Sequence, residues 1–353
     1  MVIDVAVVAV AQMPNVRAET RLNEVEMLMP VLEDVKAKAG LVQQQIGFTC
    51  SGSTDYLSGQ AFSFVSTLDG VGPWPPIQES HVEMDGAWAL YEAWVKLQLG
   101  DVDTALVYSY GKSAPGPIHE VLSRQLDPYS VAPLWPDAIS LAALQARSLL
   151  EAGKATEADF AEVASRSRRS AMGNPNAQLA WDRSAQDLLA EEPIVDPLRK
   201  HDCPPITDGA CAVVLASGDR ARELHDRPAW IRGIDHRIEP MALGRRELAT
   251  STSTRVAGEK AGVGTKPVDV AELHAPFSPQ ELILREALGL GDHGNVNPSG
   301  GALAANPIMV AGLTRIAEVA QRIMDGTADR GVAHATSGPC LQQNLVAVLE
   351  GDE

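Results

Sequence analysis

Short apolar runs alternate with longer amphipathic segments along this chain of 353 residues, and this alternation limits the possible fold more than any other feature. The apolar runs at residues 1–13 and 210–216 are typical of strands that are covered on both faces. The segment 82–99 places large aromatic side chains at helical spacing and ends at Gly100, a residue that favours helix termination. The pattern predicts a layered α/β fold with a mostly buried sheet.

The same order of elements occurs twice. In the first half, a helix over 82–99 precedes a strand over 104–110, and a second strand over 210–216 follows a long insertion. The second half has a helix, a strand, a turn and a strand at residues 308–324, 331–335, 337–339 and 345–349. We therefore expect two similar halves and one inserted loop subdomain. Their bounds are 1–110 with 206–222 for the N-terminal half, 111–205 for the insertion and 223–353 for the C-terminal half.

Two further segments have a distinct character. The insertion carries helical patterns over 138–153 and 157–171, and we expect it to lie over one face of the sheets. The segment 246–266 combines the run Ser251-Thr-Ser-Thr254 with three glycines. This composition predicts a mobile surface loop.

Net charge limits the class of partner. Acidic residues outnumber basic residues 46 to 29, which gives a formal net charge of −17. A field of this sign repels phosphate backbones and anionic lipid headgroups, so neither nucleic acid nor a membrane surface is an expected partner. The apolar run at 1–13 has no basic leader and is too short to cross a bilayer. We therefore expect a soluble, cytoplasmic protein.

The four cysteines, Cys50, Cys203, Cys211 and Cys340, include no CxxC pair. The spacing of Cys203 and Cys211 does not match a zinc site, so no metal site is predicted. Free thiols in this number fit a reducing compartment.

Three segments carry a family resemblance. Thr207-Asp-Gly-Ala-Cys-Ala-Val-Val-Leu215 matches a D-G-A-A-A-V-V-L strand, and Glu272-Leu-His-Ala-Pro-Phe-Ser278 matches an E-L-H-D-x-F-S segment. Asn297-Pro-Ser-Gly-Gly301 with Asn306-Pro307 is similar to a G-G…G-H-P segment that is one residue longer. In these motifs the chain resembles the thiolase superfamily, and within it the sterol-carrier-protein-type thiolases and their lipid-transfer-protein relatives. The resemblance covers nearly the whole chain.

The segments Gln78–Trp88 and His334–Asn344 look closer still to one actinobacterial branch of lipid-transfer proteins, associated with breakdown of sterol side chains. The resemblance implies a five-layered αβαβα fold, a dimer, and an acyl-CoA substrate, with no tightly bound cofactor. The partner is a second copy, a second thiolase-like chain, or a small protein with an OB fold and a zinc ribbon. We predict that dimerisation uses an edge strand over 61–68 and the helix that begins near Val82.

The residues that a thiolase uses for catalysis are largely replaced. The resemblance places Glu83 where the nucleophilic cysteine belongs and Asn306 where the histidine of G-H-P belongs. The position of the second catalytic cysteine of a thiolase falls near residues 337–338, and Cys340 lies a residue or two away. Of the catalytic positions, only His274 holds the residue type that the family uses. A carboxylate cannot replace a thiolate in forming and breaking a thioester, so thiolysis and Claisen condensation are not expected.

The remaining chemistry is stabilisation of a thioester enolate by hydrogen-bond donors. A retro-aldol cleavage of a β-hydroxyacyl-CoA needs such donors and a base, and it needs no covalent intermediate. We therefore predict an acyl-CoA carbon–carbon lyase, or a subunit of one, in sterol or lipid catabolism. The alternative is a catalytically silent thiolase-fold subunit that binds acyl-CoA or scaffolds an active paralogue. An ordinary acetyl-CoA acyltransferase is the least favoured interpretation.

Four residues are the candidate catalytic groups: His274, Glu83, Asp85 and Asn306. We expect His274 to point into a crevice at the strand ends and Asn306 to donate a hydrogen bond, although Asn306 can equally cap the helix over 308–324. Glu83 is expected to begin the helix over 82–99, where it serves as the base or only as a helix-start residue. Asp85 is expected to face elsewhere on that helix.

Other side chains are weaker candidates. The phenols of Tyr56, Tyr108 and Tyr110 can act on an aldol oxygen or simply pack in the core, and Cys340 is either a reactive thiol or a small buried filler. The resemblance implies that basic residues in the insertion hold the phosphates of CoA, the alternative being a solvated basic face. These residues are Arg166, Arg168 and Arg169.

Overall fold

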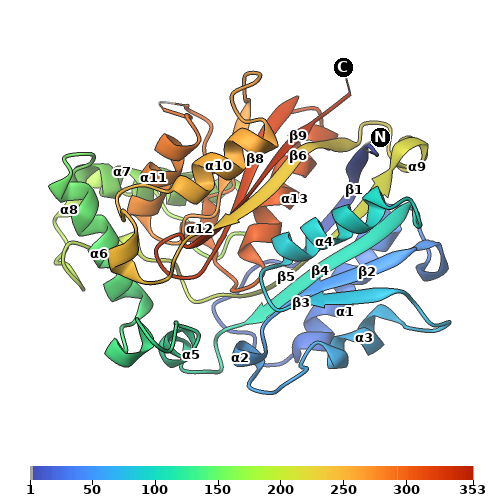
Figure 1. Ribbon diagram of the computed structural model, residues 1–353, viewed down its shortest axis with the longest axis horizontal. Coiled ribbons are helices and arrows are strands. Elements are labelled where there is room, and N and C mark those ends of the chain that lie inside the picture. The colour runs from blue at the N-terminus through green and yellow to red at the C-terminus, as the bar shows by residue number, and fades with distance from the viewer. Residues whose placement is uncertain (1–2, 292, 353) are drawn as a thin grey trace.

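The computed structural model describes residues 3–291 and 293–352. Within these residues the strands form one nine-stranded sheet in the order β3-β2-β4-β5-β1-β6-β9-β8-β7 (Figure 1). The strands are β1 Val5–Gln12, β2 Phe48–Gly52, β3 Glu79–Val82, β4 Thr104–Lys112, β5 Asp208–Ser217, β6 Ala229–Ile238, β7 Val270–Leu273, β8 Arg330–Ser337 and β9 Gln343–Glu350.

The helices follow the two halves and the insertion. The N-terminal half contains α1 Glu24–Lys38, α2 Asp55–Ser58, α3 Val65–Val71, α4 Gly86–Gln98 and α9 Gly218–Leu224. The insertion contains α5 Ile118–Arg124, α6 Ala138–Glu151, α7 Glu157–Ser170 and α8 Ala185–Leu189. The C-terminal half contains α10 Thr252–Ala261, α11 Ser278–Ala287, α12 Gly301–Ala304 and α13 Ala311–Met324.

The sheet consists of two halves that meet at a narrow junction. Among the described residues, strands β1 and β6 pair only through Ala6 with Trp230 and Val7 with Ala229. On one side of this junction lie β3-β2-β4-β5-β1, and on the other lie β6-β9-β8-β7. Helices α4 and α13 share one buried core with strands of both half-sheets.

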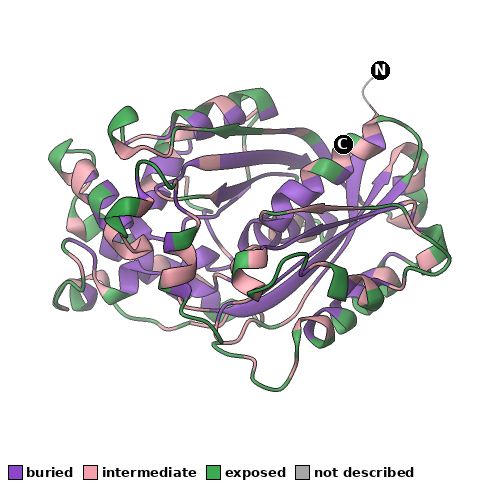
Figure 2. Cartoon of the chain, turned by 60° about the horizontal axis from the view of Figure 1, so that its bottom comes forward, coloured by how far each residue is buried: buried purple, intermediate pink, exposed green. Residues whose placement is uncertain are grey.

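Side-chain alternation along the strands defines the layers. On β5, Cys211, Val213 and Leu215 pack into the central core with α4 and α13, whereas Ala212 and Val214 face the outer core with α1. The C-terminal half repeats this arrangement, with α13 on its inner face and α10 and α11 on its outer face. Apart from the edge strand β3 and the second half of β6, the strands are buried along most of their length (Figure 2). The architecture is the predicted five-layered αβαβα arrangement of two similar halves.

The insertion covers the outer side of the C-terminal half. Helices α6 and α7, predicted from sequence, pack against α11, and they lie with α8 at one end of the molecule (Figure 1). Leu149 of α6 and Phe160 of α7 are buried in the same core as Leu284 of α11. The insertion therefore extends the core of the C-terminal half.

The predicted mobile loop over 246–266 is wrong, because this segment contains α10. Ser251 caps the helix by accepting a hydrogen bond from the backbone N–H of Thr254 at 3.3 Å. The helix packs closely on β6, where a Cβ atom on Gly233 would lie 2.3 Å from the carbonyl oxygen of Ala261. In the sequence, the small residues of this segment suggest a loop. In the structure, small residues allow α10 to pack closely on β6.

The predicted edge strand over 61–68 is also wrong. The chain forms turns there, and α3 begins at Val65. The edge of the N-terminal half-sheet is β3, which pairs in parallel with β2 and has its other side unpaired among the described residues. Phe62 and Trp74, in the segments between β2 and β3, are exposed. Dimerisation near this edge remains a prediction, with β3 in place of the segment 61–68.

One buried carboxylate joins the two halves. Asp85 is the N-cap residue of α4 and accepts a hydrogen bond from the N–H of Ala87 at 2.9 Å. It also accepts hydrogen bonds from the N–H groups of Gly312 and Leu313, both at 2.9 Å, in the first turn of α13. A side chain on Gly312 would collide with this carboxylate, because its Cβ would lie 2.5 Å from Asp85 Oδ1. Asp85 thus holds the N-termini of both central helices together.

We expect Asp85→Asn to lower the free energy of unfolding by roughly 2–3 kcal/mol, because an amide places a donor against one of three buried N–H groups and removes the charge that two helix N-termini stabilise. Urea unfolding followed by circular dichroism measures the change. Asp219→Asn is the control, since that side chain is 99% exposed, and it should change stability by less than about 0.5 kcal/mol. Equal effects of the two substitutions would contradict the assigned role of Asp85.

Candidate functional site

A cavity of about 1170 Å³ opens where the insertion, the C-terminal half and the N-termini of the two central helices meet. All four predicted catalytic residues line it: His274, Glu83, Asp85 and Asn306. Much of the remaining wall is apolar and comes from the insertion, the C-terminal half and the segment before α13. The apolar residues include Leu122, Leu126, Leu141, Met241, Phe277, Ile308 and Met309.

His274 and Asn306 form a hydrogen-bonded pair in the cavity wall. His274 directly follows β7, as predicted, and its Nε2 lies 3.0 Å from Asn306 Oδ1. Its Nδ1 accepts a hydrogen bond from the backbone N–H of Thr336 at 3.3 Å. Burial lowers the pKa of His274 to about 3, even though the hydrogen bond to Asn306 favours the charged form. The imidazole is therefore neutral at physiological pH.

Asn306 is not a helix cap. Helix α13 begins at Ala311, and no side chain of its N-cap residue, Val310, satisfies its first N–H groups. Asp85 accepts the hydrogen bonds from N–H groups in the first turn of α13 instead, so Asn306 is not needed as a cap. The helix-cap alternative for Asn306 is therefore wrong.

The two carboxylates have different surroundings. Asp85 is buried, and burial raises its pKa although three backbone N–H groups lower it. It faces the same cavity as Glu83, so the expectation that it faces elsewhere is wrong, but its oxygens are already occupied as acceptors. Asp85 is therefore poorly suited to act as a base.

Glu83 lies before α4 and does not begin it, because the shorter side chain of Asp85 takes the cap position. One oxygen of Glu83 accepts hydrogen bonds from Thr54 Oγ1 at 2.8 Å and from the N–H of Asp55 at 2.6 Å. The other lies 3.3 Å from His81 Nε2. The side chain is 47% exposed. Glu83 is thus a fixed carboxylate at the wall of the cavity, with access to solvent and to a ligand.

No cysteine is placed to act as a thiolase nucleophile. Cys340 lines the cavity, but it is buried, burial raises its pKa to about 11, and its thiol donates to the carbonyl of Leu141 at 3.2 Å. The other three cysteines are also buried and do not line this cavity. Burial raises the pKa of Cys203 and of Cys211 to about 12. These thiols are packing groups.

The three tyrosines separate into two kinds. Tyr108 and Tyr110 are buried on β4 in the core beside α1 and do not line the cavity. Burial raises the pKa of Tyr108 to about 12. Tyr56 does line the cavity and is 55% exposed.

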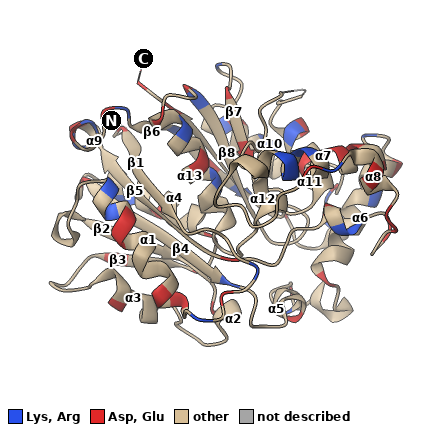
Figure 3. Cartoon of the chain, turned by 180° about the vertical axis from the view of Figure 1, so that it is seen from behind, with Lys and Arg blue, Asp and Glu red and all other residues tan. Residues whose placement is uncertain are grey.

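The arginines predicted to hold CoA phosphates do not line this cavity. Arg166 forms an ion pair with the buried Glu281 of α11, and Arg169 pairs with Asp182 at 2.6 Å. Arg168 is buried, and burial lowers its pKa to about 10. Acidic and basic residues lie side by side around α7, α8 and α11 (Figure 3). These arginines hold the insertion together and tie it to α11.

Sequence reasoning missed two residues that shape the site. The guanidinium of Arg246 donates to the carbonyls of Pro339 and Cys340, both at 2.8 Å, and so fixes the turn that borders the cavity. Gln280 lines the cavity and donates to Gln145 of the insertion at 3.0 Å. No local motif marks either residue, because their partners lie far away in the sequence.

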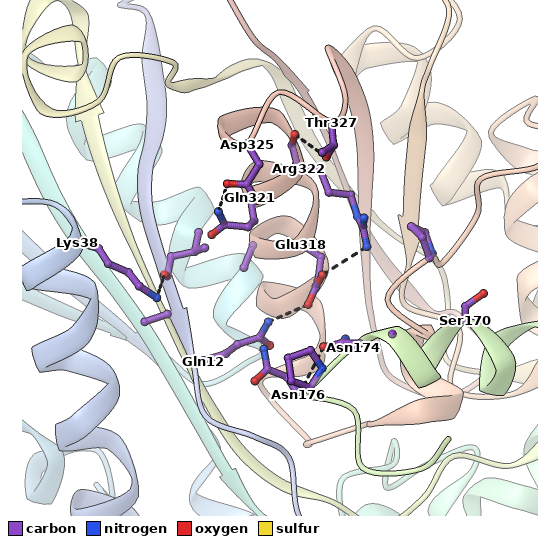
Figure 4. Close-up of a pocket in the computed structure, with 16 residues that line it drawn as sticks. Gln12, Lys38, Ser170, Asn174, Asn176, Glu318, Gln321, Arg322, Asp325 and Thr327 are labelled. Carbon is purple, nitrogen blue, oxygen red and sulfur yellow. Dashed lines mark hydrogen bonds and ion pairs between the residues drawn. The ribbon is translucent and has the colours of Figure 1, made fainter. Parts of the chain in front are cut away.

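A second cavity of about 650 Å³ lies on a different part of the molecule, between β1 and the C-terminal part of α13 (Figure 4). Its wall is polar, and Glu318 accepts a hydrogen bond from Gln12 Nε2 at 2.8 Å. None of the predicted catalytic residues lines it. Among the described residues, no cluster of side chains is suited to holding a metal ion, and no helix has the length and hydropathy needed to span a membrane.

The chain has an α/β fold of thiolase-like architecture. No family model matches the chain. It is 30% identical to an acetyl-CoA acetyltransferase of Methanothermobacter thermautotrophicus over 56% of its length and 58% of that protein. It is 25% identical to sterol carrier protein 2 of Bos taurus over 89% of its length and 64% of that protein. The chain thus spans less than two thirds of the length of these relatives.

Two solved structures share the fold. The Ltp2-ChsH2(DUF35) aldolase superposes with a TM-score of 0.82 at 20% identity, covering 99% of this chain and 98% of the other. The acetyl-CoA acetyltransferase of Bacillus anthracis superposes with a TM-score of 0.79 at 18% identity over 99% of both chains. The predicted resemblance to the thiolase superfamily, and within it to sterol-carrier-protein-type and lipid-transfer members, is confirmed.

We expect stability to fall as the pH drops below about 6.5, because His274 and His334 are buried with pKa values lowered to about 3 and about 4. Between these values and 6.5 the unfolded chain binds protons that the folded chain does not, so each histidine removes up to about 1.4 kcal/mol per pH unit. Urea unfolding at pH 7.5, 6.5 and 5.5 measures this slope.

His334→Gln should reduce the slope by the contribution of one histidine. His119→Gln is the control, because His119 is exposed on α5. A slope that His334→Gln leaves unchanged would contradict the neutral state assigned to His334.

Proposed function

We propose that this chain acts as, or as a subunit of, an acyl-CoA carbon–carbon lyase of retro-aldol type in sterol or related lipid catabolism. One observation carries the proposal: the cavity combines a preorganised amide and imidazole pair with a carboxylate and lacks an ionisable thiol. This set can stabilise an enolate and cannot form an acyl-enzyme.

The shape of the cavity supports a bulky acyl group. A volume of about 1170 Å³ exceeds what a short acyl chain needs, and its apolar wall favours burial of hydrocarbon. Arg124 of α5 is the one arginine among the described lining residues, and its side chain is 60% exposed. We place the CoA phosphates near Arg124, with the acyl group directed toward His274 and Asn306. CoA is in this proposal part of the substrate.

The reaction needs no oxidant and no covalent intermediate. A base removes the proton of the β-hydroxyl group, and the O–H electron pair forms the new carbonyl. The Cα–Cβ bond breaks, and its electrons pass to the thioester as an enolate, which a proton then quenches at Cα. The products are a ketone or aldehyde and a shorter acyl-CoA. Glu83 is the best placed base, since it is accessible and already held by Thr54 and Asp55.

We also propose that the chain works in an assembly. Among the described residues one side of β3 is unpaired, and Phe62 and Trp74 in the segments that precede it are exposed, which suits a homodimer or a heterodimer with a second thiolase-like chain. One relative, from Thauera aromatica, is a benzoylsuccinyl-CoA thiolase subunit, 28% identical over 56% of this chain and 59% of that protein. The structural neighbour is an aldolase of two named components. A small OB-fold and zinc-ribbon partner, and a cytoplasmic location, belong to the same proposal.

The test is an assay of the native assembly, purified by a tag on this chain, on a β-hydroxyacyl-CoA that carries a ring system. We expect a shorter acyl-CoA and a ketone in equal amounts, and no acetyl-CoA from a 3-ketoacyl-CoA incubated with free CoA. Robust thiolysis would contradict the proposal. Absence of both activities, with acyl-CoA binding intact, would support the alternative of a silent subunit.

If Glu83 is the base, Glu83→Gln should lower kcat by about 10²–10⁴ with little change in acyl-CoA binding, because an amide cannot accept the proton. The matched control is Glu151→Gln, an exposed position at the end of α6 outside the cavity. Isothermal titration with a non-cleavable acyl-CoA measures binding. A kcat within a few-fold of the wild-type value would remove Glu83 from the mechanism.

A further inference from the structure

We infer that His274 is a positioning residue that fixes the side-chain amide of Asn306, and that the N–H group of Asn306 is the one that meets the enolate oxygen. The inference rests on the proposed lyase function and assigns separate roles to two residues of its site. It follows from the hydrogen bonds of the imidazole, which leave His274 no free group to offer to a ligand.

The tautomer of His274 is determined by its two partners. A backbone N–H can only donate, so the hydrogen bond from Thr336 requires a lone pair on His274 Nδ1. A neutral imidazole then carries its proton on Nε2. That N–H lies 3.0 Å from an oxygen of Asn306 and donates to it.

The same constraint fixes the orientation of the Asn306 amide. Its oxygen and nitrogen are hard to distinguish by shape, and the hydrogen-bond network decides between them. Because His274 Nε2 is a donor, the Asn306 atom facing it must be Oδ1. The Nδ2 group is then on the other side of the amide and has no hydrogen-bond partner among the described residues. Asn306 is partly exposed and lines the cavity.

The backbone of Asn306 is held as firmly as its side chain. Its N–H donates to Thr207 Oγ1 at 3.1 Å, and the next residue, Pro307, forms a bridge with Thr207 beside β5. A donor fixed at both ends needs no reorganisation as charge develops on a ligand oxygen, and this property makes an oxyanion site effective.

Acid or base catalysis by His274 does not fit these contacts. As a base, His274 would have to use the Nδ1 lone pair that Thr336 already occupies. As an imidazolium, it would place an N–H against the N–H of Thr336, inside a wall where the side chain is 7% exposed. His334 and Arg315 both oppose a positive charge on His274.

The structural readout is ¹⁵N NMR of the intact chain labelled at histidine, with His274→Gln used to assign the signal. We expect a neutral ring protonated at Nε2 at pH 7 and still neutral at pH 5.5. This measurement does not depend on enzyme activity. A ring protonated at Nδ1, or a cationic ring at pH 7, would overturn the inference even if the lyase function holds.

The kinetic readout is a double-mutant cycle on the assembled enzyme. Asn306→Ala should lower kcat by about 10²–10³. His274→Ala should lower kcat in the wild-type background, and it should have almost no further effect when Asn306 is already Ala, because His274 acts through Asn306. Additive losses would mean that His274 contacts the substrate directly and would overturn the inference.

His274→Gln gives a rescue test. The glutamine Nε2 group reaches the place of the imidazole Nε2 and can still donate to Asn306, so it should restore most of the turnover that His274→Ala loses, with KM unchanged. Glutamine that is as defective as alanine, in a chain that melts like the wild type, would contradict the positioning role. If the wild-type assembly has no lyase activity, the proposed function fails, and the NMR result alone decides the tautomer.

Discussion

The carboxylate of Asp85 is the contact on which the geometry of this protein depends. The half-sheets are joined by two residue pairs between β1 and β6 and by the central core that α4 and α13 share with both. Asp85 supplies a polar connection inside this core, since its oxygens accept hydrogen bonds from N–H groups in the first turns of both α4 and α13. Two helix N-termini directed at one carboxylate stabilise its charge. The cavity opens at this junction, so its dimensions depend on it.

The cavity of this chain differs from a thiolase site because it holds no sulfur nucleophile, and this difference limits the chemistry that the fold can support. The fold still directs two helix N-termini and the loop after β7 at one cavity. Without an ionisable thiol there, the remaining groups can only polarise a ligand and move protons. Asn306, where the resemblance expects a histidine, is a neutral donor at every pH, and the buried His274 serves to orient it.

The basic cluster on α7 makes structural contacts in the folded protein and does not line the cavity. Arg166, Arg168 and Arg169 form a basic cluster on α7, yet their acidic and carbonyl partners come from α11, the segment after α7, and the loop before β5. Ion pairs of this kind connect the insertion to the C-terminal half. The apolar wall that the insertion contributes to the cavity is positioned by them. The packing of the insertion therefore depends on contacts that lie outside the cavity itself.

Local sequence was enough to predict the layered α/β class, the duplication, helices α6 and α7 of the insertion and four residues that line the cavity, because apolar periodicity and short motifs are local properties. Tertiary structure decided the rest. Ser, Thr and Gly in 246–266 suggested a loop, but small residues also allow α10 to pack on β6. The roles of Glu83 and Asp85 depend on the hydrogen bond that Asp85 accepts from the N–H of Gly312, 227 residues away in the sequence. The tautomer of His274 depends on the backbone N–H of Thr336, which is 62 residues away. Such hydrogen bonds exist only once distant segments are packed together, so no local pattern could reveal them.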